Sequence, residues 1–157
     1  MKDFLLIVII FYISIELHEI IHCISYIILD MKIKKFYFFP FDWTEEGLKI
    51  RPELGKNYFG IVLPYNYKGY TIKQLRRKLM IALVTPSIVH LFTFIGGMFV
   101  FCILKDDIFL DISLVNLLCV LSTLISSENV CGDLIAFYHL FKNDETSRRI
   151  ISSVFDI

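Results

Sequence analysis

Long apolar segments separated by short polar ones dominate this chain of 157 residues. Three apolar blocks cover residues 4–29, 79–104 and 108–141, and the polar stretch SSENVCGD at 126–133 interrupts the third. A helix that crosses a bilayer needs about 20 apolar residues, so each of the first two blocks is long enough for one span. The third block is too long for one straight span, which predicts a crossing that is broken near 126–133.

The segment at residues 30–78 has a different pattern. Aromatic and β-branched residues in KIKKFYFFPF and KNYFGIVLPYNY flank turn-forming residues, which predicts a small β-hairpin or a three-stranded sheet. The following TIKQLRRKL is typical of a short basic amphipathic lead-in to the second span.

The predicted fold is therefore an all-α polytopic membrane protein with a small β-hairpin segment between its first and second crossings. It has three main transmembrane crossings, the third broken near its cytoplasmic half. We expect one integral membrane domain over residues 1–157, in which 142–157 form a tail.

Charge distribution predicts the orientation. The 30–78 segment holds eleven of the 16 lysines and arginines, whereas the short link at 105–107 has one lysine beside two aspartates. Because cytoplasmic loops carry the excess of basic residues, we expect 30–78 and the C-terminal tail in the cytoplasm and the N-terminus outside. The sequence thus predicts a multi-pass protein of the cell membrane.

Composition agrees with a membrane environment. Apolar residues make up 56% of the chain and charged residues 20%, against about 45–50% and about 25% in ordinary globular chains. The formal net charge of zero indicates no nucleic-acid partner. The first block is longer than the apolar core of a signal peptide and lacks a small-residue cleavage site, which favours a retained transmembrane helix.

The first apolar block carries titratable side chains at its centre, in the stretch IELHEIIHC. His18, Glu19 and His22 form an H-E-x-x-H motif, whose two histidines lie four residues apart on one face of a helix and can bind one metal ion. Glu19 would lie near a water molecule activated by the metal and act as general base. Ionisable residues inside a span are functional by default, so we expect zinc chemistry rather than a metal-free polar helix interface.

Catalytic zinc usually has three protein ligands, and Asp133 is the predicted third. It lies nine residues before Lys142, about 13 Å along a helix, and His22 lies eight residues before Asp30, about 12 Å. Both side chains would therefore reach the same depth from the cytoplasmic side. Metals similar to zinc, such as cobalt, remain open.

Other polar residues are weaker candidates. Glu45 or Glu46 would be the third ligand in a soluble-type zincin tethered by one span, and Cys131 is an alternative to Asp133. Glu16 either supports the site or serves as a structural acceptor, and His90 either donates to the tetrahedral intermediate or is an ordinary core histidine. Ser127 and Asn129 either line a cavity at the break or satisfy its freed backbone groups.

The motifs together resemble a known family. HEIIH in the first block, ALVTPSIVH in the second and Gly132-Asp133 at the break are similar to the site-2 protease class of intramembrane zinc metalloproteases. The resemblance covers about residues 10–142 and is greatest to the short bacterial zincin peptidases of that type, whose late motif ends in Gly-Asp. It implies an aspartate-completed zinc site in the bundle and a cytoplasmic β segment that presents a membrane-spanning or membrane-adjacent peptide.

The expected function is hydrolysis of a peptide bond by metal-activated water, with Zn²⁺ as the cofactor and the lipid bilayer as the surroundings. The alternative is a catalytically silent membrane protein with a structural metal site or an accessory or immunity role. Glu19 distinguishes the two, because a structural site needs no carboxylate beyond its ligands.

Overall fold

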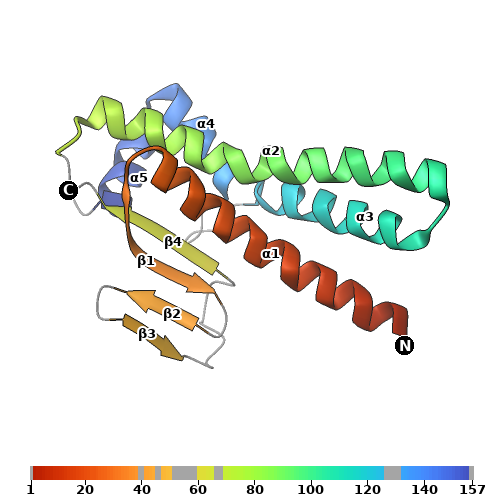
Figure 1. The fold of residues 1–157 in the computed structure, drawn as a ribbon. Coiled ribbons are helices and arrows are strands. Elements are labelled where there is room, and N and C mark those ends of the chain that lie inside the picture. The colour runs from red at the N-terminus through yellow and green to blue at the C-terminus, as the bar shows by residue number, and fades with distance from the viewer. Residues whose placement is uncertain are drawn as a thin grey trace.

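The computed structural model describes residues 2–38, 41–44, 47–50, 60–65, 69–125 and 132–155. The described residues form five helices and a small sheet; the sheet lies at one end of the molecule, and the long helices extend from there towards the other end (Figure 1). The helices are α1 (Lys2–Ile28), α2 (Ile72–Leu104), α3 (Asp107–Ser122), α4 (Asp133–Lys142) and α5 (Glu145–Phe155). The strands are β1 (Lys32–Phe38), β2 (Phe41–Thr44), β3 (Gly47–Ile50) and β4 (Gly60–Tyr65).

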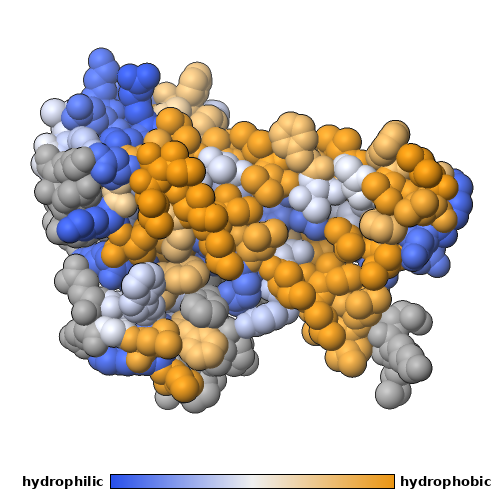
Figure 2. Space-filling view, in the orientation of Figure 1, coloured by the Kyte–Doolittle hydropathy of each residue, from blue (hydrophilic) through white to orange (hydrophobic). Residues whose placement is uncertain are grey.

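Helices α1 and α2 match the first two predicted spans. Phe4–Ile28 and Ile72–Leu104 are long and apolar enough to cross a membrane, with 25 and 33 residues. Only 6% of the first and 11% of the second apolar window is buried inside the protein, whereas the core helix of a soluble protein is mostly covered. Figure 2 shows the resulting apolar surface along the long helices, with polar residues gathered towards the two ends of the molecule. This surface favours association with a membrane.

The predicted third crossing is not a single span. Helix α3 has 16 residues, about 24 Å, and α4 has only 10, about 15 Å. Among the described residues, two helices and not three are therefore long and apolar enough to cross a bilayer. The third block yields no helix of that length because the expected break divides it: α3 ends before Thr123, and a separate helix starts at Asp133.

The segment between α1 and α2 forms a sheet larger than the predicted hairpin. Four antiparallel strands lie in the order β3-β2-β1-β4. Phe36 in the central β1 pairs with Trp43 on one side and Val62 on the other, so the aromatic and β-branched residues form the sheet as their pattern indicates. The basic lead-in is a continuous part of α2, which starts at a Thr71–Gln74 capping box.

The main hydrophobic core lies where the C-terminal end of α1 and the N-terminal end of α2 meet α4 and α5. These are the helix ends predicted to face the cytoplasm. Lys78 Nζ donates to the Leu29 carbonyl oxygen at the end of α1, and Asp30 adopts a left-handed conformation with φ 58° that turns the chain into β1. The expected tail is mostly helical, because α5 buries one face against this core. The buried apolar side chains of the core are Tyr26, Met31, Leu75, Leu79, Ala82, Leu83, Ala136, Leu140, Ile151 and Phe155.

Candidate metal centre

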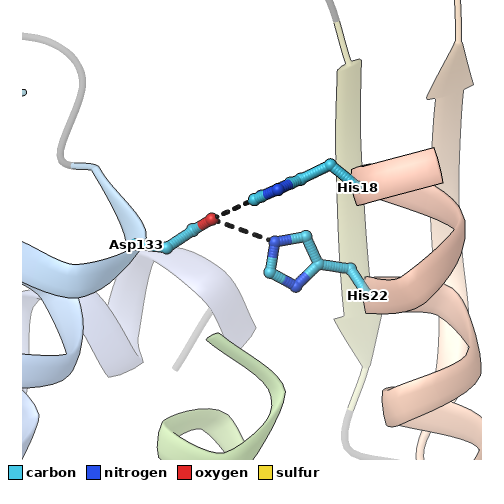
Figure 3. Close-up of side chains that lie close together, drawn as sticks. All are labelled: His18, His22 and Asp133. Atoms are coloured by element: carbon cyan, nitrogen blue, oxygen red, sulfur yellow. Dashed lines mark hydrogen bonds and ion pairs between the residues drawn. The ribbon is translucent and has the colours of Figure 1, made fainter. Parts of the chain in front are cut away.

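Helix α1 presents His18 and His22 on one face, directed towards the start of α4 (Figure 3). Their ring centroids lie 4.9 Å apart, as expected for residues that follow each other after about one helical turn. The His18 side chain is 12% exposed and that of His22 is 7% exposed, so neither is a surface histidine. The helical spacing of the motif therefore places both imidazoles on one face of α1, and this face is turned towards the interior of the protein.

The end of the break places Asp133. Gly132 N donates to the Ile125 carbonyl oxygen at 3.0 Å, and Leu134 N donates to that of Thr123 at 3.2 Å. A Cβ atom at position 132 would overlap the carbonyl oxygens of Thr123 and Ile125, which are backbone atoms and cannot rotate away. Only glycine allows this close approach, and the approach brings the first residue of α4 beside α1.

Three predicted ligands converge on one point. His18 Nε2 lies 2.8 Å from Asp133 Oδ2, and His22 Nε2 lies 3.1 Å from the same oxygen (Figure 3). One ligand atom from each of the three residues lies within 4.8 Å of the others. In a tetrahedral zinc site the ligand atoms are about 3.3 Å apart, given bonds of about 2.0–2.1 Å. A small outward movement of the side chains would therefore accommodate the ion.

Hydrogen bonding around His22 shows why this cluster suits a cation. Its Nδ1–H donates to the Ala82 carbonyl oxygen at 3.0 Å, because a carbonyl can only accept. The Nε2 of a neutral His22 then carries a lone pair, and so does the Asp133 oxygen facing it. Two lone pairs at 3.1 Å repel unless a proton or a metal ion lies between them. The bond from Nδ1 to a backbone carbonyl is also the usual support of a metal-binding histidine.

Glu19 lies beside the three residues without being one of the converging ligands. Its carboxylate interacts electrostatically with His22, His18 and Asp133, and its side chain is half-buried. Glu16, one turn earlier, is also half-buried and interacts with Tyr12. Glu19 thus interacts with all three converging residues, and Glu16 lies about one turn before it on the same helix.

His90 of α2 lies directly against the cluster. It is fully buried, and its ring stacks on that of His18 with centroids 5.3 Å apart and planes 14° apart. Its Nδ1–H donates to Asn116 Oδ1 of α3 at 2.6 Å. Asn116 belongs to none of the predicted site residues, although one amide in the otherwise apolar LVNLLCV stretch is the kind of signal that marks a buried polar contact.

Several predicted residues are not tested by the structure. Ser127, Asn129 and Cys131 in the break lie outside the described residues, and so do the alternative ligands Glu45 and Glu46. Among the described residues, the group that could hold a metal ion is therefore His18, His22 and Asp133.

Comparison with known protein families, curated proteins and solved structures gives no match to this chain. Its resemblance to site-2 proteases therefore remains a prediction carried by the motifs.

Proposed function

We propose that this protein is a zinc-dependent peptidase of the membrane, similar in kind to the site-2 proteases. The observation that carries the proposal is the convergence of His18, His22 and Asp133 on one point. The residues come from α1 and α4, which lie more than 100 positions apart in the chain. The arrangement of His22 between the Ala82 carbonyl and Asp133 leaves its Nε2 suited to a metal ion.

The residues supply a set of groups sufficient for peptide hydrolysis. Zinc held by the two histidines and Asp133 would supply Lewis acidity and lower the pKa of water to about 7. Glu19 takes one proton from the attacking water while the water oxygen forms its bond to the carbonyl carbon of the peptide. The same carboxyl group then passes that proton to the leaving nitrogen as the C–N bond breaks, so no further reactant is needed.

The membrane placement is part of the proposal. Exposed apolar side chains on α1 and α2 support two crossings, and α3, the break and α4 together would form the third, interrupted one. The basic residues of 30–78 support a cytoplasmic sheet and tail, with the N-terminus outside. His22 lies six residues before the end of α1 at Ile28, about 9 Å along the helix, so hydrolysis would occur in the cytoplasmic half of the bilayer.

A groove beside α1 supports a membrane-spanning or membrane-adjacent peptide as the substrate. It has a volume of about 550 Å³ and runs between one face of α1 and the sheet. Two of its lining residues are close to Glu19 in the chain: Ile20 follows it directly, and Cys23 lies one helical turn after it. An apolar segment in this groove would lie close to the proposed general base. The lining residues are Ile20, Cys23, Ile24, Ile27, Asp30, Met31, Lys32, Ile33, Phe36 and Trp43.

Two measurements test the proposal in sequence. Zinc content per chain is measured in detergent-purified wild type, His18→Ala and Asp133→Ala, with helix content followed by circular dichroism. About one zinc ion in the wild type, lost in both folded variants, is the expected result. No zinc in the wild type under chelator-free conditions would remove the basis of the proposal.

Glu19→Gln then separates the peptidase from a structural metal protein. It should retain zinc and lose cleavage of single-span reporter proteins in proteoliposomes, because the amide cannot accept the proton of the water. A zinc site with a fourth protein ligand and unchanged behaviour of Glu19→Gln would instead favour the structural or accessory role.

A further inference from the structure

His90 and Asn116 form a buried polar pair that the three-ligand site does not explain. His90 has 0% and Asn116 4% of its surface exposed, and both lie on helices that face apolar surroundings. A buried imidazole without hydrogen bonds on both nitrogens is costly, so its position calls for a physical reason.

The hydrogen bonds determine which nitrogen of His90 carries the proton. The amide Nδ2 of Asn116 donates to the Ile112 carbonyl oxygen at 2.8 Å, which directs its Oδ1 towards His90. Because Oδ1 can only accept, the 2.6 Å contact requires the proton on His90 Nδ1. A second proton on Nε2 would create a buried cation with no acceptor among the described residues. His90 is therefore neutral, with a lone pair on Nε2.

The ring that carries this lone pair lies against the predicted metal centre, because it stacks on His18. Nε2 of His90 has no hydrogen-bond partner among the described residues, and its ring lies parallel to that of the predicted ligand His18. His90 is not part of the group of ligand atoms that lie within 4.8 Å of one another, so it is placed beside the ligands and not among them.

We infer that His90 positions the attacking water by accepting a hydrogen bond from it at Nε2, with Asn116 holding the required tautomer. This inference rests on the proposed peptidase function and adds a positioning residue to it. Glu19 accepts one hydrogen of the water and His90 Nε2 the other, so the oxygen lone pair is left to attack the carbonyl. The tautomer makes His90 an acceptor at Nε2, which differs from both roles predicted for it, a donor to the tetrahedral intermediate and an ordinary core histidine.

Two variants separate this role from packing. His90→Phe combined with Asn116→Leu keeps an aromatic ring against His18, removes the acceptor and leaves no buried amide without its partner. His90→Gln gives up the aromatic stack but supplies an amide oxygen near the position of Nε2. Each is compared with the wild type after loading with Co²⁺, a spectroscopic substitute for zinc. The visible absorption and the relaxation rate of water protons report the ligands and the exchangeable water at the ion.

The expected result is about one Co²⁺ per chain in all three proteins, with altered absorption and water relaxation only in the His90→Phe/Asn116→Leu variant. Its kcat on a cleaved reporter should fall about 10- to 100-fold at unchanged KM, with His90→Gln much closer to the wild type. Wild-type spectra in the phenylalanine variant and altered ones in His90→Gln would show that only ring packing matters and would overturn the inference. Loss of Co²⁺ from both variants would make His90 a ligand and would overturn it as well.

The spectroscopic readout needs no substrate, so the two proposals can fail separately. A wild type that binds Co²⁺ with the expected variant spectra but cleaves no reporter would contradict the peptidase function and support His90 as the group that holds the water. Cleavage by the wild type with identical spectra in all three proteins would contradict only the role of His90.

Discussion

The Nδ1 of His22 on α1 donates to the carbonyl oxygen of Ala82 on α2, 3.0 Å away. Together with the stack of His18 on His90, this hydrogen bond joins α1 and α2 at the predicted metal centre, and it orients the imidazole so that Nε2 faces Asp133 on α4. The relationship connects the packing of three helices to the geometry of the site. A change in either should therefore be measurable in the other.

Metal binding should stabilise the fold, since the ligands come from two helices that are brought together only in the folded protein. A ligand at 100 times its Kd stabilises by about 2.7 kcal/mol. Adding Zn²⁺ to chelator-treated protein in detergent should raise the thermal unfolding temperature of the wild type. Asp133→Ala is the matched control and should show a much smaller rise. Equal rises in both proteins would place the stabilising ion elsewhere.

Gly132→Ala should lower metal affinity although it leaves every ligand in place. The added Cβ meets the Thr123 and Ile125 carbonyl oxygens, so the start of α4 must move away from α3 and take Asp133 with it. Overpacking of this kind costs about 1–3 kcal/mol, which corresponds to an expected rise in the Kd for Zn²⁺ of about 5- to 150-fold. Competition with a chromophoric chelator measures this Kd. Gly96→Ala, where a Cβ has open space, is the control and should bind as the wild type does.

Gly97→Ala should destabilise the contact between α2 and α3, whereas Gly96→Ala should not. A Cβ at position 97 would overlap Ser113 Oγ and approach the Phe109 carbonyl oxygen to 3.3 Å, but a Cβ at position 96 has no neighbour within 4 Å. We expect a loss of about 1–3 kcal/mol for Gly97→Ala from unfolding titrations in mixed micelles. Similar stabilities of the two variants would argue against close packing of α3 on α2.

Docking of α5 should weaken at acid pH through Asp144. Hydrogen bonds from His139 and from the Ser147 backbone N–H lower the pKa of the Asp144 carboxyl below its ordinary value of about 3.9. A carboxyl whose pKa is lowered by folding contributes stability above its unfolded value, and that contribution is lost as pH falls through the folded value. Asp144 also caps α5, which depends on the charged form.

The test compares wild type with Asp144→Asn by hydrogen exchange of the α5 amides between neutral and acid pH. In the wild type, protection of the α5 amides should fall as acid protonates the Asp144 carboxylate. The asparagine variant should not show this fall, because it has no carboxyl group to titrate at this position. Parallel pH profiles in the two proteins would show that Asp144 does not contribute.

Much of the candidate site follows from local spacing. The four-residue separation of His18 and His22 places them on one face of any helix, and an apolar run of this length can form little else, so their side-by-side arrangement needs no tertiary information. Asp133 was predicted from its depth along the chain, since rise per residue is the same in every helix. The structure confirms that these three residues lie together.

The sequence by itself determined the features that depend on helical period, segment length and composition. These are the two long apolar helices, the antiparallel sheet between them and the paired histidines. Only the tertiary structure decided that the Ala82 carbonyl orients His22 and that Asn116 gives His90 its tautomer. The physical reason is that these features depend on contacts between atoms 26 to 60 positions apart, which no local period encodes.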